Sequence, residues 1–360
     1  MPNEGDNMLS QVKSLKPLMD KYKEAIHEEV NKYIAPTHLH SVSNLENSKI
    51  MDFFWEQLAD YPNRGGKYIR SILISLTCEA LGGSFANTLP TASAMELSQN
   101  WILIHDDIED SSNMRRGKKA HHLIYGTNQS INAGDALHMV MWRALYDNLN
   151  LLDHDTAKLV MDEFYMMLMR TCVGQTAEMD WRNSYELTEN EVNYILDGKT
   201  GYYTIAGPMR LGAILAGKTP STDPELFSTI DEFGLNLGRA FQITDDILDL
   251  TSDFAGLKEK GNDIQEGKRS LLFIRLQRAL SGKELDSFKT IMDKEIGAKS
   301  QEEINSIIAL MEQKNIIAEA KKEALEFASK SKEVLAKLPF DDTVKSIFSE
   351  LIVFLVERNY

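Results

Sequence analysis

The chain is poor in the residues that break helices or cross-link loops. Its 360 residues include 2 Cys, 9 Pro and 21 Gly. So few prolines and glycines disfavour a turn-rich β structure and favour helices. The two cysteines, Cys78 and Cys172, do not suggest a disulfide framework, and they are typical of a reducing, cytoplasmic location.

Long hydrophobic runs and an excess of positive charge are also missing. No segment approaches the ~20 apolar residues that cross a bilayer, and the first residues lack the apolar segment of a secretory signal. The formal net charge is −15, which argues against nucleic acid as a partner because binding to a phosphate backbone needs a basic face. We therefore expect a cytoplasmic protein with no transmembrane segment.

Apolar residues recur at helical spacing along most of the chain, and no segment alternates convincingly as a strand does. Lys67–Leu81 is one such helical segment, and breaks are expected at Tyr61–Pro62 and Gly207–Pro208. No long linker or repeat divides the chain. We expect residues 1–7 to be disordered and residues 8–360 to form one all-α domain, a bundle of about ten or more helices.

The most informative stretch reads NWILIHDDIEDSSNMRRGK, from Asn100 to Lys118. Asp106 and Asp110 are four residues apart, so they share one face of a helix. Oxygen ligands suit Mg²⁺, and guanidinium groups match phosphate with two hydrogen bonds. The alternative is a solvated helix end with scattered charge. The acids and arginines of this first motif are Asp106, Asp107, Asp110, Arg115 and Arg116.

A second copy of the acidic pattern makes a metal site the better interpretation. FQITDDILDL, at Phe241–Leu250, repeats the spacing with Asp245, Asp246 and Asp249 on another apolar helix. Gln242 precedes these acids by one turn. Two such clusters facing each other across a helical bundle would hold several Mg²⁺ ions around one diphosphate.

The motifs together resemble the trans-isoprenyl diphosphate synthases of the polyprenyl synthetase family, over about Gly65–Arg269. That family has DDxxD followed by RRG, and later a second DDxxD. The resemblance implies helices around a deep central cavity, a homodimer, and about three Mg²⁺ ions per site, with Mn²⁺ as an alternative. It also implies transfer of an allylic group (dimethylallyl, geranyl or farnesyl) to isopentenyl diphosphate by ionisation, condensation and elimination.

The resemblance carries individual roles onto this sequence. GGKYIRS matches the family's GGKRxRP, although Tyr68 and Ser71 replace the usual Arg and Pro. A solvated first helical turn is the simpler reading of that segment alone. The residues implied to bind isopentenyl diphosphate are Lys67, Arg70, Gln99 and Arg116.

Further cations are implied to bind the allylic diphosphate. Leu257 stands before Lys258 where the family often has Gly, so Lys260 is an alternative to Lys258. Gln175 and Glu178 resemble the family's GQxxD, with Glu for Asp. The full allylic set is Arg115, Lys199, Thr200, Gln242, Lys258 and Lys268, and the implied catalytic residues are Asp106, Asp110, Lys199 and Asp245.

Product length depends on what lies below the first motif. Trp101 is five residues before Asp106, and the small residues Ser98 and Ala94 lie further back on the same helix. In the family, a bulky aromatic at this place forms a floor and goes with short products. The uninterrupted DDIED resembles archaeal and eukaryotic forms. We therefore expect geranylgeranyl diphosphate (C20), with farnesyl diphosphate (C15) as the alternative.

Two other functions fit part of the pattern. A class I terpene cyclase also has a DDxxD motif, but it has no use for the isopentenyl diphosphate set around Lys67 and Arg70. A non-catalytic subunit of a synthase would usually have lost one aspartate cluster, and both are present here.

Overall fold

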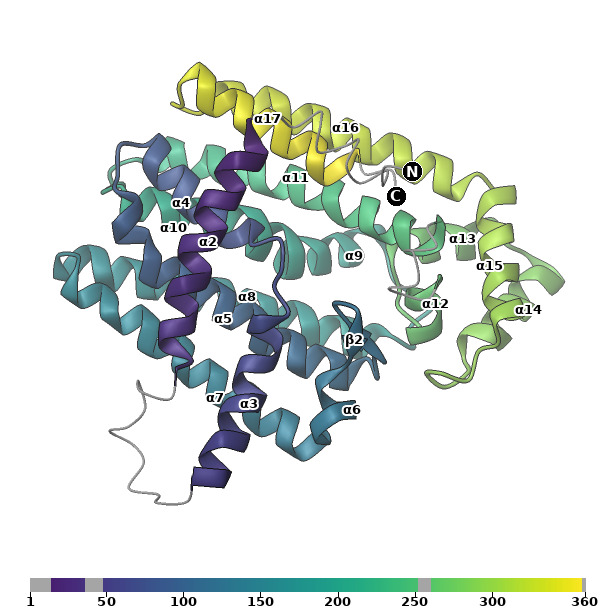
Figure 1. Cartoon of the computed structure of the whole chain (residues 1–360). Coiled ribbons are helices and arrows are strands. Elements are labelled where there is room, and N and C mark those ends of the chain that lie inside the picture. The colour runs from purple at the N-terminus through teal and green to yellow at the C-terminus, as the bar shows by residue number, and fades with distance from the viewer. Residues whose placement is uncertain (1–13, 36–47, 252–259, 358–360) are drawn as a thin grey trace, which may run out of the picture. The chain divides into compact units, whose positions relative to one another are not determined.

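The structure is a computed structural model that describes residues 14–35, 48–251 and 260–357. Over these ranges almost every element is a helix (Figure 1), so the all-α prediction is confirmed. The expected disorder of residues 1–7 lies outside the described residues. The chain groups into unit 1 (Met1–Leu15, Tyr165–Gly207 and Pro224–Tyr360) and unit 2 (Lys16–Phe164 and Pro208–Asp223).

Unit 2 contains the helices on either side of the first motif and a two-stranded hairpin. The first part of α8 (His154–Trp181) also belongs to it. Its other elements are α2 (Leu15–Tyr33), α3 (Ser48–Asn63), α4 (Ile69–Ala80), α5 (Phe85–Glu109), β1 (Met114–Arg115), β2 (Lys118–Lys119), α6 (His121–Tyr125), α7 (Thr127–Tyr146), η2 (Asp147–Asn150) and α10 (Gly207–Leu215).

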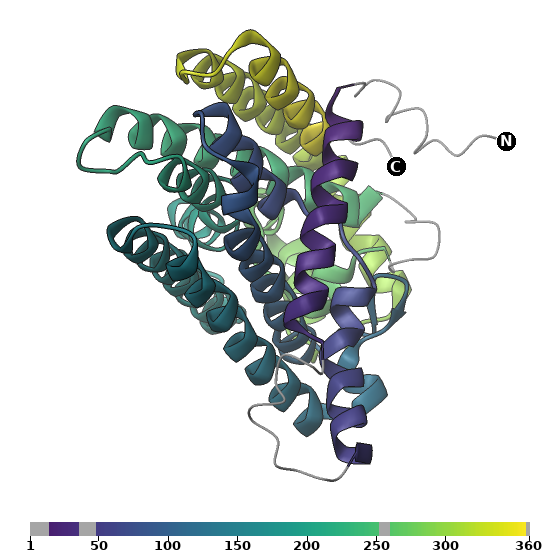
Figure 2. The same cartoon turned by 60° about the vertical axis from the view of Figure 1, so that its left-hand side comes forward.

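Helix α5 is the centre of unit 2 and packs against both α4 and α7 (Figures 1 and 2). Small residues allow the close approach. A side chain at Gly134 of α7 would begin 2.3 Å from Nε2 of His105 on α5. Met95 and Leu97 of α5 are fully buried, and each such side chain contributes roughly 1.5–3 kcal/mol by leaving water. This packing fixes the helix whose last turn carries the first motif.

Unit 1 contains the rest of α8 and the helices around the second motif. In Figure 1, α11 runs alongside α16, and the two helices pack together. The other elements of unit 1 are α9 (Glu189–Ile195), the π-helix η3 (Leu196–Ala206), α11 (Pro224–Thr251), α12 (Asn262–Glu266), α13 (Leu271–Ala279), α14 (Gly282–Met292), α15 (Gln301–Gln313), α16 (Ile316–Lys337) and α17 (Asp342–Val356).

Local sequence explains where several of these helices begin. Thr188 and Glu191 form a capping box at the start of α9, and Ser300 and Glu303 form another at the start of α15. In each box the hydroxyl accepts the N–H of the glutamate while the glutamate accepts the N–H of the capping residue. Asp341 caps α17 by accepting the N–H of Val344 at 2.8 Å.

Some expected boundaries were wrong by a few residues. Helix α4 begins at Ile69 rather than Lys67, because Tyr68 has a left-handed backbone with φ 56°. Helix α3 continues through Pro62 and ends at Asn63, so the proline costs an N–H only in the last turn. Gly207 and Pro208 do not interrupt the helical structure. They begin α10, where a proline in the first turn is tolerated.

Two further observations bear on the sequence-based expectations. The short strands β1 and β2 pair antiparallel, Met114 with Lys119 and Arg115 with Lys118, although no strand was expected. Across residues 14–35, 48–251 and 260–357, no helix has the length and apolar character needed to cross a membrane.

Candidate active site

The first aspartate motif lies at the C-terminal end of α5. The backbone N–H of Asp110 donates to the carbonyl of Asp106 at 2.8 Å, so the two residues are one helical turn apart. The side chain of Asp106 is 20% exposed and Asp110 is buried. The end of a helix that carries exposed carbonyls is its negative end. Two carboxylates at this place therefore favour a bound cation.

Asp107, the middle acid of the motif, points into the protein. It is fully buried, and Arg115 donates to it through Nε, at 2.9 Å from Oδ1, and through Nη2. The hydroxyl of Tyr61 also donates to Asp107. Burial by itself would lower the pKa of Arg115, but the hydrogen bonds and charge of Asp107 outweigh it and raise that pKa. Asp107 is thus bonded to protein groups, and its hydrogen bonds orient Arg115.

A hairpin positions the paired arginines. Arg64, which directly follows α3, donates to the carbonyls of Arg115 and Lys119, both at 3.0 Å, and so anchors both strands. Arg116 follows in a left-handed conformation with φ 52°. Its Nη1 donates to the carbonyl of Tyr61 at 2.8 Å. The two arginines are therefore held by different parts of α3 and α5.

The residues expected to bind isopentenyl diphosphate all belong to unit 2. Lys67 is exposed just before α4, and Arg70 lies half-buried in the first turn of that helix. A side chain at Gly66 would begin 3.4 Å from Nη2 of Arg116, so the GGK and RRG segments meet. Within the described part of the chain, Oε1 of Gln99 is buried without a hydrogen-bond partner, as expected of a group that awaits a ligand.

The second aspartate motif lies on α11 in unit 1. Asp245 is exposed, whereas Asp246 and Asp249 are buried. Gln242 donates to Oδ1 of Asp246 at 2.8 Å and accepts from the hydroxyl of Thr200 at 2.9 Å. Gln242 therefore connects the Lys199–Thr200 pair with the second motif, and the middle acid again has a protein partner.

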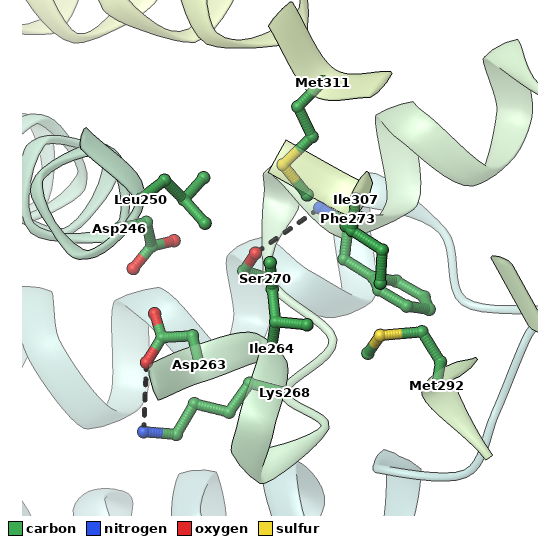
Figure 3. A pocket seen from close by; sticks show the side chains of 10 residues that line it. All are labelled: Asp246, Leu250, Asp263, Ile264, Lys268, Ser270, Phe273, Met292, Ile307 and Met311. Carbon is green, nitrogen blue, oxygen red and sulfur yellow. Dashed lines mark hydrogen bonds and ion pairs between the residues drawn. The ribbon is translucent and has the colours of Figure 1, made fainter. Parts of the chain in front are cut away.

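A small pocket beside the second motif shows how these acids are arranged (Figure 3). The carboxylates of Asp246 and Asp263 point toward each other, and Lys268 pairs with Asp263 at 3.5 Å and with Glu266 at 2.6 Å. Burial, followed by the charge of Asp263, raises the pKa of Asp246 well above its usual value. The remaining lining residues are Leu250, Ile264, Ser270, Phe273, Met292, Ile307 and Met311.

Lys199 lies in the π-helix η3. Helices of this type are rare in proteins, and those that occur are often found at functional sites. Its Nζ contacts both carboxylate oxygens of Glu178, at 3.1 and 3.0 Å. The Glu that replaces the family's usual Asp is therefore the partner of the lysine. Lys258 lies outside the described residues, while its alternative Lys260 is described and half-buried.

Trp101 contacts a histidine that the sequence pattern did not single out. Its ring lies 5.0 Å from that of His138 on α7, and Nε1 of Trp142 donates to Nε2 of His138 at 2.9 Å. Burial lowers the pKa of His138, which favours the neutral ring. Ala94 and Ser98 are fully buried on the same helix as Trp101.

Sequence reasoning also missed Tyr61, Glu96 and Asn100. Tyr61 had no visible signal, because its role depends on α3 folding against the hairpin. Glu96 had one, since it is a single acid in the otherwise uncharged helical stretch before Asp106.

The donor groups fit magnesium better than a transition metal. No group of three His, Cys, Asp or Glu side chains gathers as a cation site in the ranges that the structure describes. Mg²⁺ needs only one or two carboxylates, because waters and substrate phosphates complete its shell. Asp106 with Asp110, and Asp245 with Asp249, are the pairs that would hold it.

Comparison with known proteins gives consistent matches. The family model described as polyprenyl synthetase matches residues 53–311. The short chain isoprenyl diphosphate synthase of Methanothermobacter thermautotrophicus is 31% identical over 297 residues, which cover 82% of this chain and 87% of that protein.

Solved structures agree with this match. The geranylgeranyl pyrophosphate synthetase of Pyrococcus horikoshii has a TM-score of 0.80 at 28% identity and covers 96% of this chain and 99% of its own. The geranylgeranyl pyrophosphate synthase of Corynebacterium glutamicum, complexed with isoprenyl diphosphate and magnesium, has a TM-score of 0.83 at 25% identity, with 95% and 99% covered.

Proposed function

The chain belongs to the polyprenyl synthetase family, and from this premise we propose that it is a Mg²⁺-dependent prenyltransferase that condenses isopentenyl diphosphate with an allylic diphosphate. One observation carries the proposal. Each unit has a DDxxD motif on a long helix, with a cation held nearby by a buried carboxylate, Arg115 by Asp107 and Lys268 by Glu266. Cations and carboxylates placed together are what a metal–diphosphate complex requires.

The proposed reaction breaks a C–O bond and forms a C–C bond. The allylic diphosphate ionises to an allylic cation and free diphosphate, and the double bond of isopentenyl diphosphate attacks that cation. A proton then leaves, and the departing diphosphate is the proposed base, because no His or Glu of the motifs suits that role. Mg²⁺, when bound, supplies positive charge that stabilises the negative charge developing on the leaving group.

The chain's own residues bind and orient the two substrates. We propose that Lys67, Arg70, Gln99 and Arg116 bind isopentenyl diphosphate. Asp106, Asp110, Asp245 and Asp249 would hold the metal ions, about three per site. Arg115 and Lys199 supply charge to the allylic diphosphate, and the ion pairs with Asp107 and Glu178 support their orientation.

We propose geranylgeranyl diphosphate as the product. The proposed floor is the Trp101–His138 pair, which a hydrogen bond from Trp142 to His138 supports. The small residues Ala94 and Ser98 lie further back on α5. Each added isoprene unit gains roughly 4 kcal/mol, at ~0.8 kcal/mol per buried carbon. A chain therefore grows until such a floor stops it.

We also propose that the chain forms a homodimer. Ile131, Met139 and Tyr146 expose large apolar side chains on α7, at 43%, 61% and 50% of their surface. These side chains follow one another at intervals of about two turns along α7, and we take this side of the helix as the association surface. Light scattering of the purified protein tests this: a mass of twice 40.7 kDa supports a dimer, and a mass of 40.7 kDa contradicts it.

The proposed activity is tested by incubating the purified chain and Mg²⁺ with isopentenyl diphosphate and each allylic primer, followed by sizing of the product. We expect elongation to C20, and loss of turnover when a chelator removes the metal. A cyclised product from one substrate would support a terpene cyclase. Absence of any product would support a non-catalytic subunit.

A further inference from the structure

Glu96 is a buried carboxylate on α5 that no step of the proposed reaction uses. It is 5% exposed, and the hydroxyl of Ser71 on α4 donates to its Oε1 at 2.5 Å. Burial raises the pKa of Glu96, and the Ser71 hydrogen bond and the charges of Arg70 and Arg116 act against this rise. A buried carboxylate is costly unless it is hydrogen-bonded and close to positive charge. The groups that stabilise the buried Glu96 carboxylate therefore indicate its role.

Asn100, one turn along α5, ties Arg116 to the backbone of that helix at residue Glu96, independently of the Glu96 carboxylate. Its Nδ2 donates to the backbone carbonyl of Glu96 at 2.8 Å, and its Oδ1 accepts from Nη1 of Arg116 at 3.1 Å. Asn100 is 2% exposed, so this hydrogen bond is shielded from water. Glu96 and Asn100 are four residues apart and thus share one face of the helix.

Arg70 and Arg116, the two arginines near this face of α5, are both positively charged and repel each other. Burial, together with the neighbouring Arg115, lowers the pKa of Arg116, and Glu96 raises it. Arg70 is adjacent to Ser71, which bonds Glu96 directly. Two guanidinium groups that must bind one small anion repel each other, and a carboxylate close to both reduces that repulsion.

We propose that Glu96 and Asn100 are positioning residues that hold Arg70 and Arg116 in the orientation that binds isopentenyl diphosphate. This inference rests on the proposed function, because it takes both arginines as ligands of that diphosphate. Ser71 completes the arrangement. The family usually has Pro at this place, and a proline cannot donate a hydrogen bond to Glu96.

Binding measurements test the inference without requiring turnover. We expect calorimetry on the full chain to show about tenfold weaker binding of isopentenyl diphosphate to Glu96→Gln and Asn100→Leu, and about threefold weaker binding to Ser71→Ala, as for the loss of an oriented charge-assisted hydrogen bond. Binding of an allylic diphosphate should stay within about twofold. Removing a negative charge would by simple electrostatics strengthen anion binding, so weaker binding is specific to lost orientation.

Ser75→Ala is the matched control. The Ser75 hydroxyl makes a buried hydrogen bond of 2.8 Å to Thr88, also between α4 and α5, but it contacts neither arginine. The Ser75→Ala variant should bind isopentenyl diphosphate and the allylic diphosphate as tightly as the wild type does. If Glu96→Gln does not fold, Asn100→Leu and Ser71→Ala decide the question.

The outcomes separate this inference from the proposed function. Unchanged or tighter binding of isopentenyl diphosphate to the variants, or equal weakening for both ligands, would overturn the inference. A wild type that binds isopentenyl diphosphate but never condenses it contradicts the proposed function alone, and its variants still test the positioning role. A wild type that does not bind it overturns both.

Discussion

At the scale of single residues, the adjacent aspartates Asp106 and Asp107 of the first motif have different surroundings. Asp106 lies at the surface of the helix end with a side chain 20% exposed, whereas Asp107 is fully buried between Arg115 and Tyr61. Removing one partner of a buried ion pair typically costs about 3–5 kcal/mol, because the other charge stays buried and uncompensated.

Substitutions at these two positions should therefore separate stability from turnover. We expect Asp107→Asn to lower the free energy of unfolding by about 3 kcal/mol. Asp106→Asn should change it by less than about 1 kcal/mol while reducing turnover by orders of magnitude. Urea denaturation and steady-state kinetics measure the two effects. A fully active, folded Asp106→Asn protein would remove the first motif from the chemistry.

The sequence identified the acids but not which way each one faces. Spacing places Asp106, Asp107 and Asp110 together, and the prediction treated all three as metal ligands. Their separate surroundings depend on Tyr61, 46 residues before Asp107, and on the hairpin that returns Arg115. Such contacts are tertiary, so no local pattern reports them.

At the scale of elements, the π-helix η3 and α11 approach unusually closely. A side chain at Gly238 of α11 would begin 2.3 Å from Cα of Gly201 in η3. Nearby, Arg239 fixes the pair through two hydrogen bonds to Asp197, at 2.7 and 2.6 Å. The glycines thus bring Lys199 and Thr200 up to the helix of the second motif.

We expect Gly238→Ala to destabilise the protein by roughly 1–3 kcal/mol through overpacking, and to lower turnover because η3 must move. Asn236→Ala is the control on the same helix, since its side chain bonds the carbonyl of Glu232, one turn back on α11. Thermal unfolding and kinetics measure both variants. Equal stability of the Gly238→Ala and Asn236→Ala variants would show that η3 and α11 are not packed too tightly to accept a methyl group at Gly238.

Helix α6 is docked by a buried histidine and should make stability depend on pH. His121 Nε2 contacts the carbonyl of Gln57 at 3.1 Å, and burial lowers the pKa of His121 below 6.5. The unfolded state then binds more protons than the folded state, so this stabilisation is complete above pH 6.5 and is lost progressively as the pH falls from 6.5 through the lower pKa of the folded state.

Denaturation between pH 5 and 8 should show this loss in the wild type and less of it in His121→Gln. His154→Gln is the control, because the side chain of His154 is 82% exposed. Parallel stability curves for the wild type and His121→Gln would show that His121 does not resist protonation.

Helix positions were predictable where apolar periodicity was strong, as in Lys67–Leu81. Boundaries failed where backbone geometry intervened, at Tyr68 with its positive φ and at Pro62. The π-helix had no sequence signal. Its close glycine contacts with α11 are tertiary, and only the fold creates them.

At the scale of the whole molecule, the two units each carry one aspartate motif, and the prediction that these face each other stays a prediction. The residues of the proposed chain-length floor, Trp101 and His138, both belong to unit 2. Trp101→Ala should remove the indole half of the proposed Trp101–His138 floor and give products longer than C20. Chromatography of the extracted product measures the change. An unchanged product would place the floor elsewhere.

The stoichiometry of diphosphate release tests the central claim most directly. Purified chain with Mg²⁺, labelled isopentenyl diphosphate and an allylic primer should release one diphosphate for each isopentenyl unit incorporated into extractable lipid. Asp106→Asn and Asp245→Asn should each abolish both. Release of diphosphate without incorporation, or full activity in either variant, would contradict the account.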